Sequence, residues 1–108
     1  IYKNVRQTKQ SKNNFSLQST IKLSSGNEIP ILGYGTYELK GEDCLSGLEA
    51  ALKMGYRHID TAAVTETNFK FQSIEKAKIN RKELYITSKI ATTQQGYEEA
   101  KSACLTII

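Results

Sequence analysis

The stretch that decides the fold reads Gly55-Tyr56-Arg57-His58-Ile59-Asp60-Thr61-Ala62. A glycine that follows a run of helical period ends a helix, because glycine adopts the left-handed conformation without strain. The extended residues 56–60 then predict a short buried strand that delivers Asp60 to a loop. Folds that alternate strands with helices keep their functional sites at the carboxyl ends of the strands. Asp60 is therefore the first candidate functional residue.

Upstream of this stretch, the sequence predicts a β-hairpin. Residues 21–23 and 28–31 are rich in strand formers, and Gly26-Asn27 between them is typical of a tight turn. Pro30 has no N–H to donate, so we expect it at an edge or at the end of a strand.

Strands and helices alternate along the rest of the chain. A period of 3.6 residues between apolar positions predicts helices, and runs of β-formers predict strands. The predicted elements are strand 31–37, helix 42–54, strand 56–60, helix 69–78, strand 84–90 and helix 97–108. Asn80 is expected to cap the second helix at its carboxyl end. This alternation predicts an α/β fold with a parallel sheet and right-handed crossovers.

The alternation of side chains along a strand sorts residues onto two faces of the sheet. The face that carries Asp60 is expected to hold Gly33, Gly35, Tyr37, His58, Asp60, Tyr85, Thr87 and Lys89. The face that meets the helices is expected to hold Ile59, Leu84, Ile86 and Ser88. The two glycines leave room for a ligand or a neighbouring backbone on the first of these faces.

Asp60 and Lys89 each stand at the carboxyl end of a strand, and consecutive parallel strands are usually neighbours. We expect them to form a buried ion pair. Burial of such a pair costs several kcal/mol per ion in desolvation, which makes the pair a poor source of stability. A lysine beside a reacting hydroxyl lowers the pKa of that hydroxyl, and an aspartate holds the lysine in place. An ordinary salt bridge at the strand ends is the competing interpretation of these two residues.

Other polar residues are weaker candidates. Gly33-x-Gly35 is not a dinucleotide-binding fingerprint, because the third glycine would fall at Glu38 and no helix is predicted to begin there. His58, the single histidine, is interpreted as a hydrogen-bonded interior imidazole. Three tyrosines are interpreted as packing residues: Tyr34, Tyr85 and Tyr97.

The charge distribution argues against nucleic acid as a partner. Residues 1–20 hold four of the 15 basic side chains and no acidic one, so residues 21–108 hold 11 basic and 11 acidic side chains. Residues 21–108 therefore carry no net charge, which argues against a nucleic-acid-binding surface. The polar composition of residues 1–20 predicts a disordered basic extension, and a cleaved targeting segment is the alternative.

The two cysteines, Cys44 and Cys104, fall on separate predicted helices without the spacing of metal ligands. We expect two reduced thiols in the core of a cytoplasmic protein, and no metal site. The chain also lacks an apolar run of about 18 residues, so no membrane partner is expected.

Three ordered motifs resemble those of the aldo-keto reductase family. They are residues 32–37 (LGYGTY), residues 55–62 and residues 83–89 (ELYITSK), and residues 25–30 are similar to the opening hairpin of that family. The resemblance covers residues 21–108. It implies a (β/α)8 barrel, of which this chain supplies the hairpin and the first three βα units. The chain starts at Ile1 and stops within an apolar run, so we expect a part of a longer protein.

The resemblance also implies the chemistry. Members of the family mostly reduce aldehydes and ketones with NADPH, and a full-length protein is expected to be a monomer. Asp60 and Lys89 match the family's catalytic aspartate and lysine. Gly35, Thr36 and Tyr37, together with Asp60, match positions that contact the cofactor and the substrate pocket.

Two departures from the family pattern bear on activity. The family's catalytic tyrosine lies five residues after the aspartate, where this chain has Thr65. The tyrosine is either replaced by Thr65 or deleted, because the segment between Asp60 and Lys89 is one residue short. His58 is not the equivalent of the family's catalytic histidine. We expect this chain alone to be inactive, and the alternative function is a non-catalytic binding or regulatory protein of the same fold.

Overall fold

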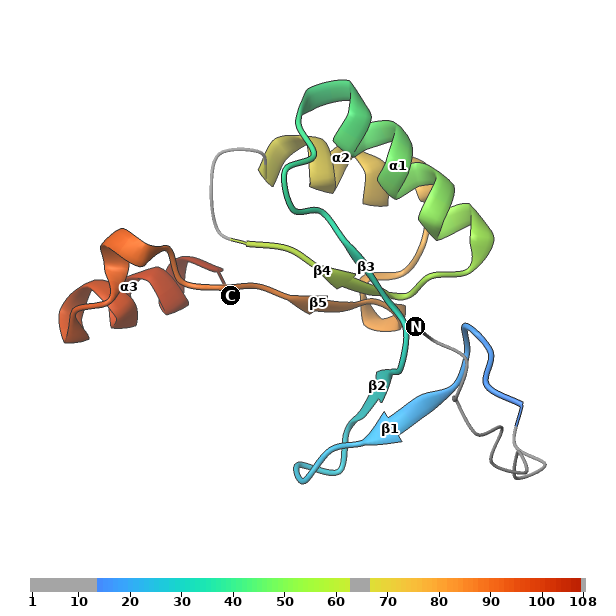
Figure 1. Ribbon diagram of the computed structural model, residues 1–108, viewed down its shortest axis with the longest axis horizontal. Helices are drawn as coiled ribbons and strands as arrows, with labels where there is room; N and C mark the ends of the chain where they lie inside the picture. Colours follow the sequence, from blue (N-terminus) through green and yellow to red (C-terminus); the bar gives the residue numbers. More distant parts are fainter. Residues whose placement is uncertain (1–13, 63–66, 108) are drawn as a thin grey trace, which may run out of the picture.

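The computed structural model describes residues 14–62 and 67–107 as a hairpin followed by three βα units (Figure 1). The strands are β1 (Thr20–Lys22), β2 (Glu28–Pro30), β3 (Gly33–Gly35), β4 (His58–Asp60) and β5 (Tyr85–Thr87). The helices are α1 (Gly41–Met54), α2 (Thr67–Ala77) and α3 (Tyr97–Ile107), and two short 3-10 turns are η1 (Arg81–Glu83) and η2 (Thr92–Gln94). The predicted order of elements is confirmed, and the 3-10 turns were not predicted.

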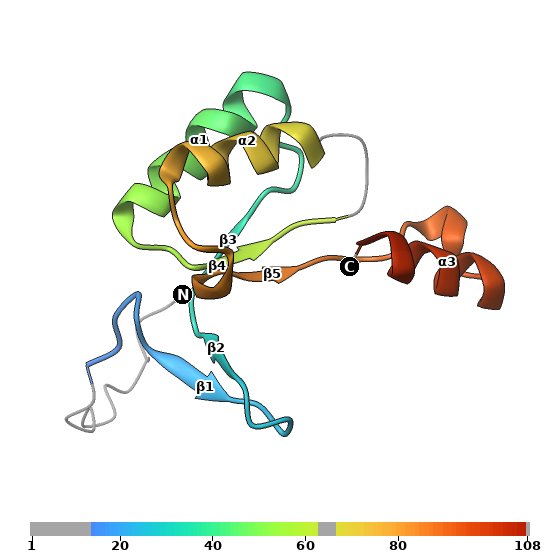
Figure 2. The ribbon, with the colours of Figure 1, turned by 180° about the vertical axis from the view of Figure 1, so that it is seen from behind.

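The three strands β3, β4 and β5 form a parallel sheet in sequence order. Gly35 pairs with Asp60, and Asp60 pairs with Thr87, so the carboxyl ends of the strands lie side by side. α1 and α2 pack together over one face of this sheet, as both views show (Figures 1 and 2). Each paired strand is three residues long and is thus shorter than predicted.

The hydrophobic core lies between the sheet and these two helices. Leu48 and Leu52 of α1 meet Ile59 of β4 and Leu84, and all four are at most 5% exposed. The half-buried residues packed against them are Tyr34, Ile74, Ala77, Ile79 and Ile86. The prediction that Ile59, Leu84 and Ile86 face the helices is confirmed, because all three belong to this cluster or pack against it.

α1 ends where the sequence predicts. Gly55 has φ +105° and its N–H contacts the carbonyl oxygens of Ala51 and Leu52, which closes the last turn. Glu42 and Asp43 lie in the first turn, where the helix dipole favours acidic side chains. The chain then enters β4 directly, and so α1 sets where Asp60 emerges.

The hairpin forms a separate two-stranded sheet in which β1 pairs with β2 in antiparallel fashion. Its turn contains Gly26 at φ +88°, and the Leu23 N–H donates to the carbonyl of Asn27 over 2.7 Å. β1 begins at Thr20, and residues 16–19 form a turn in front of it. The predicted disorder of the basic extension concerns mainly residues 1–13, which lie outside the described residues.

Several local predictions were wrong. Asn80 does not cap α2; it caps η1, where its side chain accepts from the Lys82 N–H and the Glu83 side chain accepts from the Asn80 N–H. Cys44 is buried as expected, but Cys104 is exposed and Tyr97 is 79% exposed. Within the described residues α3 extends past the end of β5, away from α1 and α2, so it covers no sheet (Figures 1 and 2).

Candidate functional site

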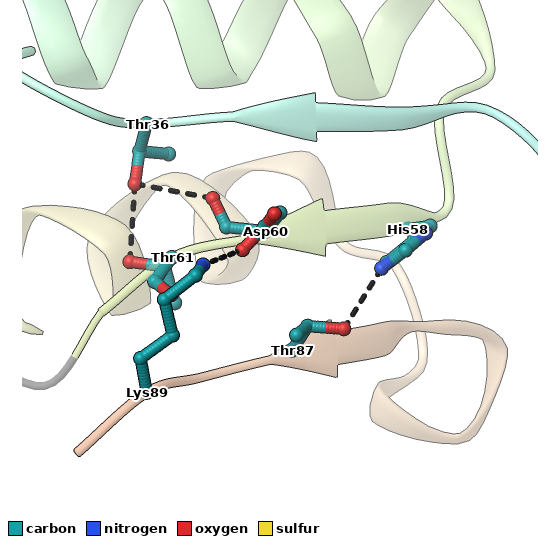
Figure 3. A network of polar contacts seen from close by, with 6 residues as sticks. All are labelled: Thr36, His58, Asp60, Thr61, Thr87 and Lys89. Carbon is teal, nitrogen blue, oxygen red and sulfur yellow. Dashed lines mark hydrogen bonds and ion pairs between the residues drawn. The ribbon is translucent and has the colours of Figure 1, made fainter.

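Lys89 and Asp60 form an ion pair beyond the carboxyl ends of β4 and β5 (Figure 3). The Lys89 ammonium contacts the Asp60 Oδ1 and also donates to the Thr61 carbonyl over 3.0 Å. The pair itself is as predicted, but its burial is not. The side chains of Lys89 and Asp60 are 57% and 45% exposed, because α1 and α2 cover the opposite face of the sheet.

Gly35, the last residue of β3, and Thr36 after it lie beside Asp60. Gly35 is in register with Asp60, and a Cβ built on Gly35 would meet no atom within 4 Å. Thr36 is 6% exposed, and its N–H donates to the Asp60 carbonyl over 3.0 Å. Tyr37 is 88% exposed. The structure therefore brings Gly35 and Thr36 next to Asp60 and leaves Tyr37 exposed to solvent.

A contact between two hydroxyl groups joins β3 to the residue after β4 (Figure 3). The Thr36 Oγ1 donates to the Thr61 Oγ1 over 3.0 Å and lies 3.5 Å from the Asp60 carbonyl oxygen. Sequence reasoning missed this contact. Strand order places the two threonines near each other, but the contact also depends on the rotamers of both side chains, which the sequence pattern does not specify.

A second group of polar contacts surrounds His58, which lies two residues before Asp60 on β4, toward the amino ends of the strands. The His58 Nε2 is 2.9 Å from the Thr87 Oγ1, and the imidazole meets the Tyr85 ring edge to face. The His58 Nδ1 is buried and has no hydrogen-bond partner among the described residues. The interpretation of His58 as a hydrogen-bonded interior imidazole thus holds for one ring nitrogen. Gly33 leaves the space that this ring needs, because a Cβ there would lie 2.8 Å from Nδ1.

No cluster of three or more histidine, cysteine or acidic side chains that could hold a metal ion occurs in the described residues. Thr65, five residues after Asp60, lies outside those residues. Among residues 14–62 and 67–107 no helix is long and apolar enough to cross a membrane.

No model of a protein family matches the chain, but individual curated proteins do. The chain is 39% identical over 90 residues to glyoxal reductase of Bacillus subtilis, a match that covers 82% of this chain and 33% of the relative. It is 38% identical over 73 residues to methylglyoxal reductase DkgA of Escherichia coli, covering 67% of this chain and 26% of the relative.

Solved structures extend the match to the fold. The crystal structure of an aldo/keto reductase from Brucella melitensis superposes with a TM-score of 0.74 at 36% identity, and the match covers 87% of this chain and 36% of the other. The chain belongs to the aldo-keto reductase family. Its hairpin and three βα units correspond to part of the (β/α)8 barrel of the aldo-keto reductases. The chain spans about a third of the length of the curated relatives that it matches.

Proposed function

We propose that this chain is part of a cytoplasmic, NADPH-dependent aldo-keto reductase that converts small aldehydes or ketones to alcohols. The observation that carries this proposal is the Lys89 ammonium, held by Asp60 Oδ1 and the Thr61 carbonyl at the carboxyl ends of parallel strands. The names of two relatives, glyoxal reductase and methylglyoxal reductase, support small aldehydes as the substrate class.

The exposure of the ion pair indicates that it serves the chemistry of the site more than the stability of the fold. An exposed ion pair stabilises a fold by only about 0–1 kcal/mol, so the pair adds little to folding. The lysine nevertheless has two acceptors on one side and open solvent on the other. A cation held in this way is available to a group that approaches the open face of the sheet.

The residues around the pair fit a nicotinamide cofactor. Gly35 leaves open space beside Asp60, and Tyr37, two residues further along the chain, is exposed. A flat ring that lies against β3 requires such a gap, which any Cβ at Gly35 would narrow. Bound NADPH would supply a hydride for the carbonyl carbon. We assign Gly35, Thr36, Tyr37 and Asp60 to its binding.

The roles of Asp60 and Lys89 follow from their charges. Reduction of a carbonyl places negative charge on its oxygen, and a proton must reach that oxygen. The Lys89 ammonium stabilises negative charge on a hydroxyl or oxygen placed beside it, and Asp60 holds the ammonium in position. The proton donor itself is not assigned to a residue of this chain.

The test is NADPH oxidation with glyoxal and methylglyoxal by the full natural protein, followed at 340 nm. Lys89→Met is expected to lower kcat by at least about 100-fold, the usual magnitude for loss of acid–base or charge assistance. Lys101→Met is the matched control, because Lys101 is an exposed lysine of α3. Equal rates for the Lys89→Met variant and the wild-type protein would contradict the proposal.

The second candidate is a non-catalytic binding or regulatory protein, and it is favoured by Thr65 in the sequence position of the family's tyrosine. A threonine hydroxyl is a weaker acid and has a shorter reach than a phenol. This candidate predicts that NADPH binds, as measured by the change in its fluorescence, while no aldehyde or ketone is turned over. Turnover that depends on Lys89 would exclude it.

A further inference from the structure

The second acceptor of Lys89 is a backbone carbonyl, that of Thr61, and the position of this carbonyl is set by the residue's other contacts. The Thr61 N–H donates to the Thr87 carbonyl over 2.8 Å, which extends the pairing of β4 with β5. The Thr61 hydroxyl accepts from the Thr36 Oγ1 over 3.0 Å, which ties it to the chain after β3. Thr61 is therefore fixed from both neighbouring strands at the point where the chain leaves the sheet.

The hydroxyl contact adds a constraint that the backbone does not supply. The Thr36 N–H already bonds to the Asp60 carbonyl, so β3 and β4 stay paired without the two side chains. The contact between the Oγ1 atoms instead restrains the Thr61 side chain, and with it the Cα from which the carbonyl that receives the Lys89 ammonium extends.

We propose that Thr61 is a positioning residue for Lys89, and that the Thr36 hydroxyl acts on the site through Thr61. This inference rests on the proposed function, since it assigns a role within the same site. Thr36 is 6% exposed, and its hydroxyl lies 3.0 Å from the Thr61 hydroxyl (Figure 3). A buried hydroxyl is costly to leave unpaired, so this contact is expected to persist when ligands bind.

The test uses the full natural protein with Thr61→Val, which removes the hydroxyl and keeps the shape of the side chain. Loss of one positioning hydrogen bond is expected to lower kcat about five- to tenfold. The KM for the aldehyde is expected to change less than kcat. Thr61→Ser restores a hydroxyl and is expected to recover most of kcat. Thr36→Val is expected to give a loss similar to that of Thr61→Val, and the double variant is expected to lose no more than either single variant.

A second readout does not depend on turnover. The rate at which an amine-directed acylating reagent modifies Lys89, measured by mass spectrometry, is expected to rise in Thr61→Val and Thr36→Val and to return in Thr61→Ser. Thr106→Val is the matched control, because the Thr106 hydroxyl bonds only within α3, to the Ser102 carbonyl over 2.9 Å. It is expected to change neither kcat nor the reactivity of Lys89.

The outcomes separate this inference from the proposed function. If the wild-type protein has no reductase activity, the proposed function fails, and the acylation rates still decide whether Thr61 positions Lys89. If Thr61→Val leaves both kcat and the acylation rate of Lys89 at wild-type values, the inference is overturned. Should Thr61→Val fail to fold, Thr36→Val decides in the same way, since it removes the other hydroxyl of the same contact.

Discussion

Gly47 offers a direct test of how α1 packs on the sheet. A Cβ built on Gly47 would overlap the hydroxyl oxygen of Tyr34 and lie 3.5 Å from its Cζ. Tyr34 is half-buried against the core and meets the Tyr56 ring edge to face at a centroid distance of 6.1 Å. The phenol ring thus has little freedom to move away. Gly47→Ala is expected to lower the stability of the fold, because the added Cβ overlaps one atom, the Tyr34 hydroxyl oxygen.

The magnitude follows from two opposing terms. Overpacking of this kind costs about 1–3 kcal/mol. Alanine is favoured over glycine in a helix interior by about 0.8–1 kcal/mol. The net effect of Gly47→Ala is therefore a loss of about 0–2 kcal/mol in the free energy of unfolding. In a Tyr34→Phe background the clash is absent, since a contact of 3.5 Å is ordinary, and the same substitution is expected to stabilise by up to about 1 kcal/mol.

The assay is chemical denaturation of the full natural protein in four forms: wild type, each single variant and the double variant. The quantity that decides is the coupling between Gly47→Ala and Tyr34→Phe, expected at about 1–3 kcal/mol. Ser46→Ala is the matched control for helix propensity, because Ser46 is exposed on the same helix. A coupling energy near zero would refute the placement of Tyr34 against Gly47.

Three further substitutions test the two faces of the sheet. Gly33→Ala places a Cβ 2.8 Å from the His58 Nδ1 and is expected to destabilise by about 1–3 kcal/mol; an unchanged denaturation midpoint would contradict this. Gly35→Val enters open space, so stability is expected to stay within about 0.5 kcal/mol while the affinity for NADPH, measured by fluorescence titration, falls; unaltered affinity would count against the cofactor assignment. Leu48→Ala empties a fully buried position and is expected to cost about 2–5 kcal/mol, and a loss below about 1 kcal/mol would show that the core lies elsewhere.

Most of the fold was predictable because its signals are local. Gly55 stops α1 through its own backbone conformation, and the period of two in the strands sorts Ile59 and Ile86 toward the helices. The pairing of Asp60 with Lys89 needed one further rule, that consecutive parallel strands are neighbours. These features depend on residues close in sequence or on a simple rule of topology.

Two of the wrong predictions concern burial, which depends on the elements that surround a residue. Cys104 and Tyr97 have the spacing of a buried helical stripe, yet both are exposed, because in the described chain β5 has a neighbouring strand on one side only. Asn80, in contrast, has the Asn80-x-x-Glu83 spacing of a capping box, which places it at the start of η1 and not at the end of α2. The exposure of Cys104 and Tyr97 thus depends on distant elements, whereas the role of Asn80 is contained in the local sequence.

The candidate site illustrates why a local prediction reached the right residues and missed how they are held. Parity and strand order place the charged groups of Asp60 and Lys89 together without any reference to side-chain rotamers. The Thr36–Thr61 contact depends instead on the rotamers of two residues 25 positions apart, which a sequence pattern does not specify. A backbone rule therefore identifies the two charged groups of the site. The hydroxyl contact beside them requires the side-chain conformations of Thr36 and Thr61 as well.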